Sequence, residues 1–143
     1  MKIVYFTSAA VLLATGCVSM SNTLSDAAYR LDRSADTLYD EVRDDTRSAS
    51  LQRDAEKFSD VAEDFHRDVR ERMPTDDLRD RFDVVSGRYH ELRDEFDEEQ
   101  RSSTRERTAF NDVTRAYLDV ERELQYDDRD RYRDRRERRK REL

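Results

Sequence analysis

The spacing of apolar residues between positions 24 and 124 constrains the fold more than any other feature of this chain. Four sets of six residues follow alternating steps of four and three, and the sets are offset by 27, 27 and 28 residues. Such steps place side chains along one side of a helix, whereas a strand needs steps of two. The sets are Leu24, Ala28, Leu31, Ala35, Leu38 and Val42; Leu51, Ala55, Phe58, Ala62, Phe65 and Val69; Leu78, Phe82, Val85, Tyr89, Leu92 and Phe96; and Glu106, Phe110, Val113, Tyr117, Val120 and Leu124, with Glu106 the one charged member.

Four amphipathic helices with short connections predict an all-α fold, an antiparallel up-down-up-down four-helix bundle over residues 22–128. Two Gly and one Pro among 143 residues make a sheet with tight turns unlikely. The composition is 44% charged, so the core must come from the four sets, and charged residues outside them, such as Asp32 and Asp36, are expected on solvent faces. Heptad-like seams of this coiled-coil type do not say whether their partners lie in the same chain, so a homo-oligomer is an open alternative.

The connections between the sets differ in the strength of their local signals. Pro74 ends the helix before it, and Thr75 is expected to cap the next one. Ser103 and Glu106 have the spacing of a capping box. Between 44 and 50 the chain has neither Gly nor Pro, so the alternative is a three-helix arrangement with residues 22–72 as one long helix. The possible caps in this weakest connection are Thr46, Ser48 and Ser50.

Residues 1–17 differ in composition from the rest of the chain. Lys2 precedes an apolar run from Ile3 to Leu13, which is shorter than the roughly 20 residues of a membrane-spanning helix. A short basic start, a short apolar stretch and small residues before a cleavage point are typical of a secretory signal. The run is therefore expected to be removed from the mature protein.

The end of this segment, Leu13-Ala14-Thr15-Gly16-Cys17, resembles the lipobox of bacterial lipoproteins, an aliphatic residue and two small residues before Cys. Ala14 stands where Leu is commonest, and Leu13 lies one residue early. The resemblance implies a lipoprotein signal peptide over 1–16, acylation (palmitate) at Cys17, and an acylated tether over 17–21. Val18 stands where lipoproteins of the inner membrane often have Asp, which implies the outer membrane, facing the periplasm.

The last fifteen residues, 129–143, form a basic, Arg-rich tail with nine basic and four acidic residues, a net charge of +5. Residues 21–128 carry 18 basic and 31 acidic residues, a net charge of −13. A basic segment in the cytosol would suggest nucleic acid, but the signal peptide argues against that partner. The alternatives are a solvated tail, either free or folded back on the acidic bundle, and a contact with anionic lipid or a cell-wall polymer.

We predict no catalytic residue, no metal site and no cofactor. The chain has neither the Gly-rich loop of phosphate binders nor the nucleophile elbow of hydrolases, and one Cys excludes a multi-cysteine metal site. His66 and His90 lie among carboxylates that could form only a weak metal site, as chance alone would supply such neighbours. Those neighbours are Asp64, Asp68, Glu91 and Asp94.

The sequence therefore predicts a protein that is not an enzyme. We expect an outer-membrane-anchored periplasmic lipoprotein with a structural or interaction role at the cell envelope. Its expected contacts are the membrane, through the acyl chains on Cys17, and a protein partner or a second copy. The alternative is a periplasmic helical protein that binds a ligand or a metal.

Overall fold

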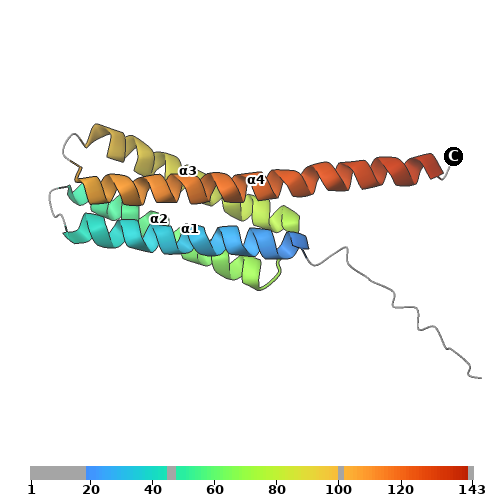
Figure 1. The fold of residues 1–143 in the computed structure, drawn as a ribbon, viewed down its shortest axis with the longest axis horizontal. Coiled ribbons are helices and arrows are strands. Elements are labelled where there is room, and N and C mark those ends of the chain that lie inside the picture. The colour runs from blue at the N-terminus through green and yellow to red at the C-terminus, as the bar shows by residue number, and fades with distance from the viewer. Residues whose placement is uncertain (1–18, 45–47, 100–101, 142–143) are drawn as a thin grey trace, which may run out of the picture.

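The computed structural model describes residues 19–44, 48–99 and 102–141, with side chains between 23 and 125. The described ranges contain the helices α1 (Ser19–Asp44), α2 (Ala49–Arg70), α3 (Thr75–Glu98) and α4 (Thr104–Arg141). The helices run alternately up and down; α1 packs against α2 and α4, and α2 also packs against α3 (Figure 1). The predicted all-α four-helix bundle is thus confirmed.

The core consists of the residues that the periodicity selects. All members of the four sets are buried except Leu24, which is half-buried and packs against the others. Three alanines outside the sets, Ala27, Ala109 and Ala116, are buried as well. Each fully buried Leu, Val or Phe side chain contributes roughly 1.5–3 kcal/mol relative to exposure, so the apolar steps stabilise the fold as well as locating the helices.

The connection with the weakest signal is a true break. Helix α1 ends at Asp44, and Ser48 is the N-cap of α2, where its Oγ accepts a hydrogen bond of 3.2 Å from the backbone N–H of Leu51. Gln52 of α2 also donates to the terminal carbonyl of Val42 in α1. The three-helix alternative, with 22–72 as one helix, is therefore wrong. Since 27 residues make seven and a half turns, an unbroken helix would place its two apolar sets on opposite faces.

Helix α2 ends in a Schellman motif. Arg72 has a φ of 58°, and its N–H donates to the carbonyl of Val69 at 3.1 Å. The N–H of Met73 donates to the carbonyl of Asp68 at 3.2 Å. These two bonds satisfy carbonyl groups at the helix end and reverse the chain direction toward α3.

Pro74 marks the start of α3, one residue before the predicted cap. Pro74 occupies the N-cap position without a side-chain hydrogen bond, and its carbonyl accepts from the N–H of Leu78 at 3.0 Å. The prediction that Thr75 caps α3 is therefore wrong, because Thr75 is already the first helical residue. Asp76 and Asp77 lie in the first turn, where negative charge interacts favourably with the helix dipole.

The capping box at the start of α4 is confirmed. The Oγ of Ser103 accepts from the N–H of Glu106 at 3.2 Å, and the N–H of Ser103 donates to the Glu106 carboxylate. Glu106 is only 4% exposed. The single charged member of the four sets thus closes the core at the helix end while its carboxylate satisfies a backbone donor.

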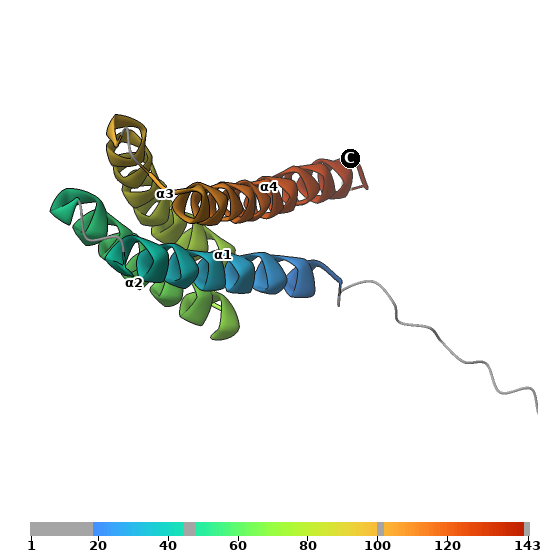
Figure 2. The same cartoon turned by 60° about the vertical axis from the view of Figure 1, so that its left-hand side comes forward.

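Aromatic rings fill the space between α3 and α4. The Tyr117 ring stacks on Tyr89 with 4.1 Å between ring centroids and on Phe82 with 5.3 Å, and Phe96 stacks on Phe110 with 4.3 Å. The backbones of α3 and α4 approach each other less closely than those of the other neighbouring pairs, and Figure 2 shows α3 inclined to α4. The rings therefore act as spacers. Hydrogen bonds from Tyr89 to Thr114 and between Ser86 and Tyr117 accompany them.

Candidate functional site

Cys17 and the signal peptide lie outside the described residues, so the predicted lipidation site has no structural account. The structure describes the chain from Ser19, two residues after Cys17. Helix α1 begins at Ser19, and only Val18 stands between that residue and Cys17 in the sequence. The start of α1 is therefore the part of the bundle nearest to the predicted anchor.

The two histidines lie on different parts of the bundle. His66 of α2 faces α1, and its Nδ1 lies 2.8 Å from Oδ2 of Asp32. Its ring also meets the edge of Tyr29, with 5.5 Å between the ring centroids. His90 of α3 contacts the ring of Tyr117 on α4, with 6.4 Å between centroids. The fold does not bring the two imidazoles together.

The carboxylates near the histidines in the sequence have arginine partners. The side chain of Asp68 is 11% exposed, and its Oδ2 lies 3.3 Å from the Nε of Arg81. The remaining pairs are Asp64 with Arg67, Glu91 with Arg88, and Asp94 with Arg93. Within the part of the chain that the structure describes, no group of three or more His, Cys, Asp or Glu side chains is arranged to hold a metal ion.

A line of polar contacts between α1 and α2 was not predicted from the sequence. Asp32 contacts His66, and Oδ1 of Asp36 accepts a hydrogen bond of 2.7 Å from the Oγ of Ser59. The side chains of Asp32 and His66 are only 13% and 15% exposed. The expectation that Asp32 and Asp36 belong to solvent faces is thus wrong, because residues one helical turn apart share the edge that meets α2. This edge fixes how α1 and α2 lie against each other.

A shallow groove runs between α1 and α4. Its charged side chains come from both helices, and Arg30 of α1 bridges to Asp119 of α4 with 3.3 Å between Nη2 and Oδ2. Tyr29, half exposed, lines the same groove. Arg33 also lines it, and its guanidinium has no ion-pair partner among the side chains described. The groove is open to solvent, and Asp112 and Asp119 line it together with the arginines.

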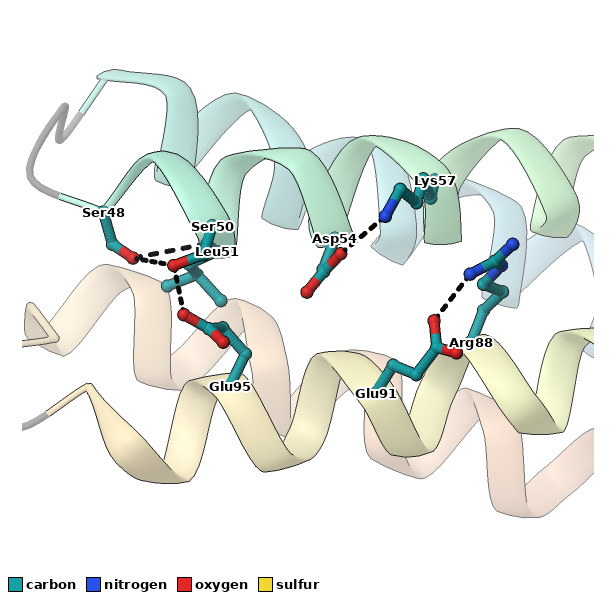
Figure 3. Close-up of polar contacts among 8 residues, drawn as sticks. All are labelled: Ser48, Ser50, Leu51, Asp54, Lys57, Arg88, Glu91 and Glu95. Carbon is teal, nitrogen blue, oxygen red and sulfur yellow. Dashed lines mark hydrogen bonds and ion pairs between the residues drawn. The ribbon is translucent and has the colours of Figure 1, made fainter.

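The surface between α2 and α3 is also built from polar pairs (Figure 3). The Oγ of Ser50 donates to the carboxylate of Glu95, which joins the start of α2 to the end of α3. Asp54 pairs with Lys57 on α2, at 3.0 Å. Most such pairs are exposed, so each contributes at most about 1 kcal/mol. In one of them, the hydrogen bond that Arg67 donates to the carboxylate of Asp64 raises the pKa of Arg67.

Helix α4 continues well beyond the bundle. Thr23 of α1 donates to Glu123 of α4 at 2.8 Å, which places these residues at the same height along the bundle axis. From there α4 runs eighteen residues further to Arg141, about 27 Å at 1.5 Å per residue, whereas α1 extends back only to Ser19, about 6 Å. The basic segment therefore projects about 20 Å past the start of α1, as Figures 1 and 2 both show.

No protein-family model, curated protein or solved structure matches this chain. None of the described helices is both long enough and apolar enough to cross a membrane. Three features remain as candidate functional sites. They are the predicted lipidation site at Cys17, the groove beside Arg33, and the helical basic arm (residues 129–143, helical to Arg141).

Proposed function

We propose that this protein is a lipoprotein of the outer membrane, anchored through acyl chains on Cys17 and facing the periplasm, with a non-enzymatic structural or interaction role at the cell envelope. The observation that carries the proposal is the sequence Leu13-Ala14-Thr15-Gly16-Cys17 at the end of a short apolar run. Each buried CH₂ of an acyl chain contributes about 0.8 kcal/mol, so several chains on one residue hold a protein stably on a membrane.

Two properties of the bundle support an interaction role. Its described core is packed with apolar side chains, and its polar surface consists largely of arginine–carboxylate pairs between neighbouring turns. Exposed pairs of this kind give the bundle a charged, polar surface. The helix nearest to Cys17 starts at one end of the bundle, which suits a protein displayed from a lipid anchor.

The test is substitution of the acylated residue in the full chain, produced in a bacterium with two membranes. Cys17→Ser is expected to abolish incorporation of labelled palmitate and to release the protein from the membrane fraction. Val18→Asp is the matched control, because it keeps Cys17 and should keep the label while shifting the protein toward the inner membrane. A Cys17→Ser variant that stays in the membrane fraction would contradict the anchor.

A second candidate, a periplasmic protein that binds a small anionic ligand, has one observation in its favour. The groove between α1 and α4 presents the guanidinium of Arg33 beside the half-exposed ring of Tyr29. Calorimetric titration of residues 19–143 with inorganic phosphate tests it. Stoichiometric binding lost on Arg33→Gln would favour this candidate over a purely structural role.

A further inference from the structure

The direction and length of α4 conflict with an upright orientation of the bundle on a membrane. On the proposed function, Cys17 lies at the membrane surface, and one residue spans at most about 3.6 Å, so α1 starts close to that surface. The basic arm projects about 20 Å past the same end. With the bundle axis upright, this arm would enter the bilayer.

The composition of the arm forbids that position. Residues 129–143 include nine Lys or Arg, and each charged residue at the centre of a bilayer costs several kcal/mol. The described α4 backbone is straight enough to carry the arm in line with the bundle (Figure 1). A bundle inclined so that the arm rests on the membrane surface, with the start of α4 raised away from it, avoids this cost.

The charge distribution favours the same orientation. Residues 21–128 carry a net charge of −13 and the arm carries +5, so an anionic surface repels the bundle and attracts the arm. Within the arm and the turn before it, the acidic positions are 127, 128, 130, 134, 137 and 142. At 100° per residue all of them fall on one half of a helix, which leaves the opposite half of the arm without acidic positions.

We propose that the helical basic arm at the end of α4 is a second membrane contact, which binds anionic lipid head groups and holds the bundle inclined on the surface that Cys17 anchors. The arm supplies charge and the acyl chains supply apolar area, and stable attachment to membranes commonly combines two such signals. The inference rests on the proposed function, because the anchor at Cys17 determines which membrane surface the arm contacts. Binding of the arm to lipid is separable from acylation.

The test uses residues 19–143, which contain the four described helices and the whole described core but lack Cys17. We expect this protein to co-sediment with vesicles of phosphatidylcholine containing phosphatidylglycerol, and not with vesicles of phosphatidylcholine alone. Basic residues near an anionic surface contribute about 1 kcal/mol each, so replacing four arginines of the arm should weaken binding at least about tenfold. That variant is Arg135→Gln, Arg136→Gln, Arg138→Gln and Arg139→Gln.

A matched control removes the same charge from the bundle. It is Arg43→Gln, Arg53→Gln, Arg70→Gln and Arg105→Gln, all at exposed positions, and it should bind the anionic vesicles nearly as well as the parent. Equal losses in the two variants, or no binding by the parent, would overturn the inference. Sedimentation of the parent as an arm-dependent dimer without vesicles, or binding to wall polymer but not to lipid, would overturn it too. None of these outcomes bears on Cys17→Ser, so the anchor stands or fails separately.

The orientation has its own measurement, because residues 19–143 contain no cysteine. Tyr132→Cys places a single thiol on the arm, and Ser102→Cys places one at the opposite end of the bundle, each for a fluorescent label. In anionic vesicles, quenchers carried by the lipid should dim the label at 132 and leave the label at 102 unchanged. Equal quenching at both sites, or quenching at 102 alone, would contradict an inclined bundle held by the arm.

Discussion

Glu106 and Arg72 each occupy a position that usually suits another type of residue. Glu106 is a carboxylate with 4% exposure at a position that the apolar periodicity reserves for the core. Arg72 has a φ of 58°, in a region that costs residues with a Cβ about 1–2 kcal/mol. Both residues lie at helix ends, where backbone groups lack partners within the helix. Each helps to satisfy such groups where the chain reverses direction.

The capping role of Glu106 predicts the effect of its removal. Glu106→Ala should lower the free energy of unfolding by about 1–2 kcal/mol, because the N–H of Ser103 loses its acceptor. Urea denaturation of residues 19–143 measures the change. Glu63→Ala removes an exposed carboxylate from the middle of α2 and should change stability by less than about 0.5 kcal/mol. Equal effects of the two substitutions would contradict the capping role.

The backbone conformation of Arg72 predicts a stabilising substitution. Arg72→Gly should raise the free energy of unfolding by about 0.5–1 kcal/mol, since glycine adopts positive φ without a Cβ clash. Arg72→Ala removes the same guanidinium but keeps the Cβ, so it should give no such gain. The midpoints of thermal unfolding for the two variants provide the comparison. If the Ala variant were the more stable one, the left-handed conformation would not be the cause.

At the scale of the helices, side-chain size sets how closely neighbours approach. Ala27, Ala109 and Ala116 are buried on α1 and α4, which lie close together. Between α3 and α4, stacked rings hold the backbones further apart. Since packed interiors have few voids, removing a ring from this row leaves a cavity that the helices can close only by moving together.

Tyr117 provides the test of the ring spacers, because it stacks on Tyr89 and Phe82 and is only 5% exposed. Tyr117→Ala should lower the free energy of unfolding by about 3–5 kcal/mol. Tyr29→Ala makes the same chemical change at a ring that is 51% exposed, and its cost should be about 1 kcal/mol or less. Denaturation of both variants in urea decides the matter; a cost at Tyr117 no larger than that at Tyr29 would mean that the rings are not spacers.

At the scale of the whole molecule, α4 extends beyond the end of the four-helix bundle. The last member of the fourth apolar set is Leu124, and the helix continues to Arg141. A helix without a packing partner depends on pairs of opposite charge three or four residues apart, worth tenths of a kcal/mol each. The arm therefore lengthens the molecule and adds positive charge to one end, and it adds no residue to the described core.

Truncation separates the arm from the core. Residues 19–128 should unfold with the same free energy as residues 19–143, within about 0.5 kcal/mol, because every described core residue precedes the cut. The helical signal in circular dichroism should fall by the contribution of the arm alone. A loss of stability above about 2 kcal/mol would instead mean that the arm folds back onto the acidic bundle.

Most of the fold could be predicted from the sequence. The step of three and four selected the core of all four helices, because burial of apolar side chains dominates helix packing. Ser103 and Glu106 located the start of α4 through local hydrogen bonds. Two details needed the structure: the cap of α3, where Pro74 took the position expected for Thr75, and the break after Asp44, where Ser48 was one of three possible caps.

The sequence by itself determined the helices, the core and the segregation of charge, and it predicts the anchor at Cys17. Those properties depend on residues near one another along the chain. Only the tertiary structure decided that Asp32 and Asp36 meet α2, that aromatic rings space α3 from α4, and that α4 stays helical to Arg141, about 20 Å past the start of α1. The physical reason is that these features depend on which helix faces which, and the periodicity of one helix does not identify its neighbour.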